Sequence, residues 1–163
     1  MSAELNDAVE MPAMTGAEMQ STREYLGFTN KWLADKFTIG ERRLFRMESD
    51  RERIPQFLVS FYDEALVATK EIVDELAAVY RRKVKANDSG APVIFLTYRS
   101  DEAYADADES VPGIDQRFCA RWHRMVGARL AERVPGLIVS YWDVDNMPEL
   151  GQPGKPRPNQ LMD

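Results

Sequence analysis

Charged and aromatic side chains face outward from a short helix that we expect over residues 41–48. They are Glu41, Arg42, Phe45 and Arg46. Their spacing places them on one side of the helix, because an α-helix makes one turn in 3.6 residues. Arginine carries several N–H donors in a rigid fork that matches base edges and phosphate groups. Such a helix, when it follows another helix and a tight turn, is a device for reading the DNA major groove.

Two earlier helices must hold that helix in position. Thr15 and Glu18 have the spacing of a capping box, so we expect the first helix to begin at Thr15. Gly27 ends this helix as a C-cap. Thr29 then caps a second helix over residues 30–37.

The second and third helices are expected to pack through apolar side chains on either side of a turn at residues 38–40. Leu44 and Met47 lie three residues apart on the inner side of the third helix. In a helix-turn-helix, the helix before the turn lies against the phosphate backbone. Its first residues should therefore offer hydrogen-bond donors to a phosphate. Here these residues are Thr29, Asn30 and Lys31.

Residues 28–48 resemble the helix-turn-helix of the Xre/Cro-type phage repressor family. The typical family pattern is Leu-Thr-Gln-x-x-Leu-Ala-x-x-Leu-Gly-Val-Ser-x-x-x-Val-x-x-Trp-Glu. The chain matches it without insertion at Thr29, Leu33, Ala34, Phe37, Ile39, Leu44 and Glu48. It departs from the pattern at Asn30, Thr38, Gly40 and Met47. Because β-branched residues disfavour a positive φ, Thr38 predicts a slightly altered turn, and Gly40 predicts a weak helix cap.

The resemblance implies which residues meet DNA. The expected base-reading residues are Gly40, Glu41, Arg42, Phe45 and Arg46. Arginine pairs with guanine O6 and N7, glutamate accepts from cytosine N4, and an aromatic ring touches a thymine methyl group. The expected phosphate contacts are Thr29, Asn30, Lys31, Arg43, Arg51 and Arg53. The alternative for these charged residues is a solvated surface without a ligand.

The rest of the chain predicts a long helix followed by a small α/β unit. The helix covers residues 55–85, and its apolar seam is Ala65, Thr69, Ile72, Leu76 and Val79. A linker at residues 87–90 marks the expected domain boundary. Strands over residues 93–98 and 137–142 flank a helix over residues 115–134, as in a βαβ unit. Since two strands are marginally stable alone, the sheet is completed by a partner copy or packs on the long helix.

The layout beyond the helix-turn-helix resembles small phage and bacterial regulators, including YdiL-like proteins and anti-CRISPR-associated repressors. The motifs that carry this likeness are residues 14–19, 54–55, 98–101 and 141–143. The resemblance implies operator binding as a dimer, which in the anti-CRISPR-associated group is made by the C-terminal part. The expected dimer-interface residues are Phe95, Tyr98, Trp122, Tyr141 and Trp142.

Charge and composition limit the function classes. The net charge of −6 argues against a nonspecific nucleic-acid coat protein. Residues 23–53 nevertheless hold eight Lys/Arg and six Asp/Glu, a local excess of +2. The sequence has neither a secretory signal nor an apolar run long enough to span a membrane, so we expect a cytoplasmic protein with no membrane partner.

Cys119 and His123 lie four residues apart, as a metal-binding pair or a Cys/His couple would. The chain has no second cysteine or histidine, so zinc would need carboxylate ligands or a second copy. The simpler interpretation is that Cys119 borders an apolar stripe and that His123 faces solvent or a helix neighbour. Acidic residues at 101–109, 143 and 145 lack the calcium-loop pattern and indicate a solvated surface.

The sequence therefore predicts an α+β protein in which a lambda-repressor-like helix-turn-helix domain precedes a small βαβ-like dimerisation domain. The expected divisions are residues 1–13, a disordered N-terminus; 14–88, the DNA-binding domain; 91–146, the dimerisation domain; and 147–163, a mobile tail. The expected function is that of a dimeric repressor of phage or mobile-element origin that binds a double-stranded inverted-repeat operator, without metal, cofactor or enzymatic activity. A protein-interaction module, such as a phage factor or antitoxin, is the main alternative. An enzyme in the C-terminal part is a third.

Overall fold

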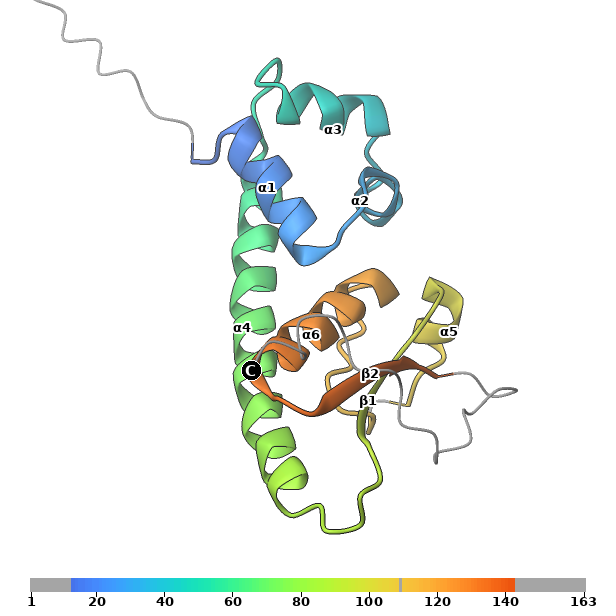
Figure 1. Ribbon diagram of the computed structural model, residues 1–163. Helices are drawn as coiled ribbons and strands as arrows, with labels where there is room; N and C mark the ends of the chain where they lie inside the picture. The colour runs from blue at the N-terminus through green and yellow to red at the C-terminus, as the bar shows by residue number, and fades with distance from the viewer. Residues whose placement is uncertain (1–12, 109, 143–163) are drawn as a thin grey trace, which may run out of the picture. The chain divides into compact units, whose positions relative to one another are not determined.

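The structure is a computed structural model that describes residues 13–108 and 110–142. Those residues form a mostly helical α+β architecture (Figure 1). The elements are α1 (Gly16–Leu26), α2 (Asn30–Phe37), α3 (Glu41–Glu48), α4 (Gln56–Lys85), β1 (Val93–Thr97), α5 (Asp101–Ala105), α6 (Ala120–Arg133) and β2 (Leu137–Tyr141). The structure confirms the predicted helical N-terminal half and the two short C-terminal strands.

The chain divides into two compact units, one up to Val67 and one from Ala68 onward. The division lies within α4, earlier than the linker at residues 87–90 where the sequence placed it. The physical reason is that the C-terminal part of α4 packs into the second unit. Trp122 Nε1 on α6 donates a 2.8 Å hydrogen bond to Thr69 Oγ1 on α4, and Tyr80 lies edge-on to Phe95.

Local capping fixes the helices of the first unit. The Thr15 side chain accepts from Glu18 N, and Glu18 accepts in turn from Thr15 N at 2.7 Å, so the predicted capping box is present. Gly27 ends α1 in the left-handed conformation, with φ of 77°. Thr29 Oγ1 accepts a 3.0 Å hydrogen bond from Trp32 N and caps α2. These three features need only neighbours in sequence, which is why the sequence predicted them.

The N-terminus of α1 meets the C-terminus of α3 at close range. Gly16 N donates a 2.7 Å hydrogen bond to Asp50 Oδ1. A Cβ atom added to Gly16 would lie 2.4 Å from Glu48 O, so only glycine fits here. Arg23 Nε on α1 lies 2.5 Å from Glu48 Oε1, and both side chains are largely buried. This ion pair and the close backbone approach fix α3 against α1.

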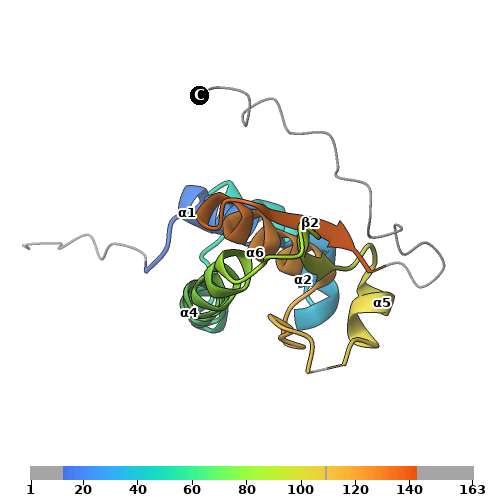
Figure 2. The same cartoon turned by 60° about the horizontal axis from the view of Figure 1, so that its bottom comes forward.

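In the second unit, β1 and β2 pair in parallel with Val93 opposite Leu137 and Thr97 opposite Tyr141. Helix α6 packs on both strands and lies along the sheet in the views of Figures 1 and 2. Gly127 on α6 allows this approach, because an added Cβ would lie 3.0 Å from a ring atom of Phe95. The Tyr80 ring of α4 lies 5.9 Å from the Phe95 ring of β1, so the sheet contacts the long helix, which is one of the two arrangements expected from the sequence.

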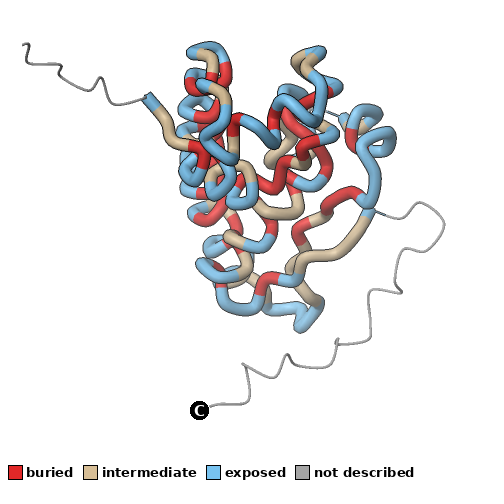
Figure 3. Tube along the Cα trace, turned by 90° about the horizontal axis from the view of Figure 1, so that it is seen from above, coloured by how far each residue is buried: buried red, intermediate tan, exposed pale blue. Residues whose placement is uncertain are grey.

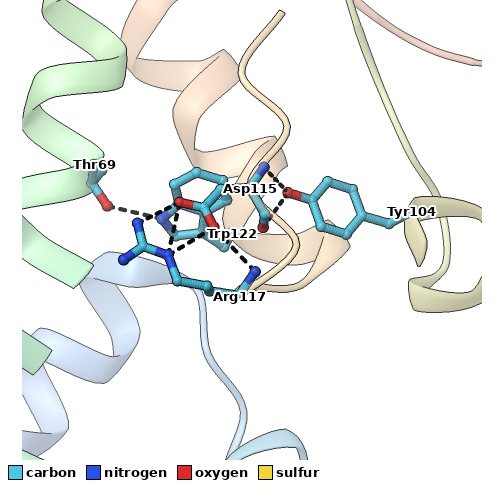
Figure 4. A network of polar contacts seen from close by, with 5 residues as sticks. All are labelled: Thr69, Tyr104, Asp115, Arg117 and Trp122. Carbon is cyan, nitrogen blue, oxygen red and sulfur yellow. Dashed lines mark hydrogen bonds and ion pairs between the residues drawn. The ribbon is translucent and has the colours of Figure 1, made fainter. Parts of the chain in front are cut away.

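Helix α6 begins at Ala120, later than the predicted start at Asp115. Residues 115–118 form a turn instead, in which the Asp115 carboxylate accepts from both the backbone and the guanidinium of Arg117. The Tyr104 hydroxyl donates to Asp115 O and accepts from Asp115 N, both at 2.9 Å (Figure 4). Asp101 Oδ1 accepts from Ala120 N at 2.8 Å and satisfies the start of α6. The helix start is thus set by residues distant in sequence.

Candidate nucleic-acid interface

Helix α3 separates its outward side chains from its inner ones. Leu44 and Met47 are fully buried. The predicted outward residues are all exposed: Glu41, Arg42, Phe45 and Arg46. Phe45 is 56% exposed, which is unusual for a large aromatic ring. Figure 3 shows buried and exposed residues alternating along the helices.

The turn before α3 keeps the backbone conformation that the family pattern normally gives to glycine. Thr38 has φ of 53° and ψ of 45°, the left-handed region. The predicted alteration of the turn is therefore not observed, and the β-branched side chain adopts the unfavourable conformation instead. Ile39 N donates to Ala34 O at 3.0 Å and closes the turn. Gly40 caps α3 without a side-chain hydrogen bond, as predicted.

The start of α2 presents only part of the predicted phosphate-binding set. Lys31 is exposed and pairs with Asp35 at 2.9 Å, and this hydrogen bond raises the pKa of Lys31. Thr29 is half-buried, with its oxygen committed to the cap. Asn30 is 9% exposed, and its Oδ1 has no hydrogen-bond partner in the part of the chain that the structure describes. The side chain of Asn30 therefore lies inside rather than on the surface.

Two of the exposed arginines, Arg43 and Arg46, contact one acidic side chain. Arg43, Arg51 and Arg53 are exposed, as phosphate contacts would require. The Arg43 guanidinium donates through Nε to Glu52 Oε1, and Arg46 Nε lies 3.6 Å from Glu52 Oε2. Sequence reasoning missed Glu52. Its position between Arg51 and Arg53 was the one available indication that an acidic residue lies among these cations.

Glu48 matches the last residue of the family pattern, and the structure gives it a positional role. The Glu48 carboxylate forms an ion pair with the Arg23 guanidinium, whose Nη1 also donates a 3.2 Å hydrogen bond to Phe28 O. The nearby Tyr62 hydroxyl is buried without a partner among the described residues. Burial, and then the Glu48 charge, raise the pKa of Tyr62. Glu48 thus anchors α3 from within and does not face the outward surface.

The expected dimer-interface residues divide into two groups. Phe95, Tyr98 and Trp122 are at most 4% exposed and form the interior of the second unit, so a second copy cannot reach them. Tyr141 is half-buried, with the Arg99 guanidinium 4.1 Å from its ring centre. Trp142 is 44% exposed, and its N donates to Thr97 O at 2.6 Å. Only the two residues at the end of β2 remain on the surface.

Cys119 and His123 are both buried, so the predicted solvent-facing position of His123 is wrong; the His123 ring lies 5.5 Å from that of Tyr104 on the neighbouring helix α5. His123 Nδ1 lies 2.9 Å from Thr97 Oγ1, and burial lowers the pKa of His123 to about 4. Burial likewise raises the pKa of the Cys119 thiol, so the thiolate nucleophile is disfavoured. Within residues 13–108 and 110–142, no group of three or more His, Cys, Asp or Glu side chains is arranged to hold a metal ion.

No helix of the described residues combines the length and apolarity needed to cross a membrane. Comparison of the chain with known protein families and with curated proteins finds no match.

Proposed function

We propose that this protein is a sequence-specific double-stranded DNA-binding transcriptional regulator that acts as a dimeric repressor. The observation that carries the proposal is the division of roles on α3. Its inner side chains, Leu44 and Met47, are fully buried, while Arg42 and Arg46 project from the opposite side with exposed Phe45. A rigidly held helix with outward arginines suits the major groove.

Recognition would combine base contacts with phosphate contacts. Arg42 and Arg46 read guanine, Glu41 accepts from cytosine, and Phe45 contacts a thymine methyl group. The exposed cations Lys31, Arg43, Arg51 and Arg53 contact phosphates and fix the register on the duplex. The protein's net charge of −6 keeps nonspecific affinity low, so selectivity depends on the base contacts.

Two copies would bind an inverted repeat and block a promoter by covering it. Major grooves on one face of B-DNA are about 34 Å apart, so the half-site centres lie about 10 base pairs apart or at a multiple of that. Support for a dimer through the second unit is limited to β2. In the described residues this strand pairs only with β1, and Trp142 at its end is exposed.

A second candidate is a lambda-repressor-like fold used to bind a host or partner protein. One observation favours it: Phe45, at 56% exposure, and the acidic Glu52 beside two arginines resemble a mixed apolar and charged protein surface. Aromatic and arginine residues are enriched at protein interfaces. The two candidates differ in their ligand, and a binding selection separates them.

The test is selection from a pool of randomised duplexes with the full chain, followed by titration at several salt concentrations. Enrichment of an inverted repeat, lost in the double variant Arg42→Ala/Arg46→Ala, supports the proposal. The matched control is Lys70→Ala, which removes an exposed cation from α4 in the second unit. Failure to enrich any sequence, with weak binding to all duplexes, rejects DNA recognition and leaves the protein-interaction alternative.

A further inference from the structure

Glu52 contacts two of the arginines on α3 at the same time. Its Oε1 accepts from Arg43 Nε, and its Oε2 lies 3.6 Å from Arg46 Nε. The Glu52 side chain is 23% exposed, whereas those of Arg43 and Arg46 are 54% and 58% exposed. The carboxylate therefore lies beneath two guanidinium groups that extend further into solvent.

The turn after α3 brings Glu52 back to this helix. Asp50 has φ of 55°, the left-handed conformation that reverses the chain at a helix end. Arg51 N then donates a 2.8 Å hydrogen bond to Arg46 O. Asp50 is itself held by the 2.7 Å hydrogen bond from Gly16 N. The position of Glu52 thus depends on a fixed backbone turn rather than on a free loop.

We propose that Glu52 is a positioning residue that sets how strongly the protein discriminates between DNA sequences. The inference rests on the proposed DNA-binding function. By engaging the Nε sides of Arg43 and Arg46, Glu52 turns their Nη groups outward. A guanidinium held in this way reaches paired acceptors, such as guanine O6 and N7, with less loss of side-chain freedom.

The same carboxylate disfavours binding to DNA of the wrong sequence. Nonspecific binding depends almost wholly on charge, and a phosphate that approaches the base-reading Arg46 meets the negative charge of Glu52 as well. A correct base edge compensates with directional hydrogen bonds, whereas a phosphate alone does not. Glu52 therefore raises the ratio of specific to nonspecific affinity by two routes, orientation and repulsion.

The experiment compares the full-length wild type with Glu52→Gln, Glu52→Asp and Glu64→Gln. Glu64 is exposed on α4 within the first unit, so Glu64→Gln also removes one negative charge, but from a helix other than α3. The probes are the duplex that the wild type selects from a randomised pool and a scrambled duplex of the same composition. Fluorescence anisotropy gives Kd for each over a series of salt concentrations, and thermal unfolding checks that every variant folds.

We expect Glu52→Gln to bind the scrambled duplex more tightly and to reduce the ratio of the two Kd values about tenfold. The salt slope on the scrambled duplex should steepen by about 0.9 for each added phosphate contact. The Glu52→Asp side chain keeps the charge but is too short to reach both arginines. The ratio of the two Kd values should therefore fall, while the Kd for the scrambled duplex stays unchanged. Glu64→Gln should leave the ratio unchanged.

Each alternative outcome is decisive. An unchanged ratio in Glu52→Gln, with selective wild type, overturns the role of Glu52 and leaves the proposed function intact. If Glu52→Gln and Glu64→Gln change the Kd ratio equally, the change comes from overall charge. If Glu52→Asp keeps the wild-type Kd ratio, the change comes from repulsion alone. Either result overturns the positioning role of Glu52. A wild type that selects no duplex rejects the proposed function itself.

Discussion

His123 predicts a specific loss of stability in mild acid. It is the single histidine of the chain and is completely buried, with its ring close to those of Phe95, Tyr98 and Tyr104. Burial lowers the pKa of His123 from 6.5 to about 4 in the folded state. Between these two values the unfolded chain binds a proton that the folded chain does not. Stability is therefore fully present above pH 6.5 and is lost as the pH falls toward 4.

The magnitude follows from the two pKa values. The complete difference corresponds to about 3 kcal/mol of unfolding free energy, reached only below pH 4. Between pH 7 and pH 5, the imidazole alone should lower the free energy of unfolding by about 2 kcal/mol. Most carboxylates are still ionised at pH 5, so this interval isolates histidine better than a full acid titration would.

The assay is urea unfolding at pH 7, 6 and 5, followed by tryptophan fluorescence. The matched control is His123→Gln, which is neutral over the whole interval and keeps the carboxylates unchanged. The wild type should lose about 2 kcal/mol more than this variant between pH 7 and pH 5. The single imidazole also gives one proton NMR signal whose titration reports the folded pKa directly. A folded pKa near 6.5, or equal pH dependence in both proteins, would refute the reasoning.

Three further predictions concern α3 and its supports. Arg46→Ala should cost about 1–3 kcal/mol in binding to the selected duplex and relax base preference while the unfolding curve stays unchanged, and an unaltered gel-shift titration would contradict this. Thr38→Gly should raise the free energy of urea unfolding by about 1 kcal/mol, because glycine adopts φ of 53° without the steric cost; Thr38→Ala is the control and should not stabilise. Glu48→Ala should lower the unfolding free energy by about 3–5 kcal/mol, because it leaves Arg23 charged and largely buried. Adding Arg23→Ala to that variant should cost less than the two single changes together, and strict additivity would show that the ion pair contributes nothing.

The first unit was predictable because its features are local. The capping box at Thr15, the C-cap at Gly27 and the inner pair Leu44 and Met47 each depend on residues within one or two helical turns. The outward residues of α3 followed from the same periodicity. Thr38 was the exception, since it adopts a left-handed backbone conformation that a β-branched residue disfavours.

The second unit was less predictable because its key contacts join distant residues. The burial of His123 depends on Thr97, and the start of α6 depends on Asp101. Glu52 was missed for a related reason. Its partnership with Arg43 and Arg46 arises from a turn whose geometry no spacing rule encodes. The aromatic residues assigned to a dimer surface were interior residues, since apolar strand and helix positions suit either role.

The division of α3 into a buried side and an exposed side would make the proposed recognition surface easy to change by mutation. Leu44 and Met47 contribute to folding, whereas exposed Glu41, Arg42 and Phe45 can change with little energetic cost to the scaffold. Single substitutions at these positions should therefore change the binding preference while each variant stays folded. A library randomised at those three positions should retain the fold in most members, which makes the chain a practical starting point for directed evolution of altered specificity.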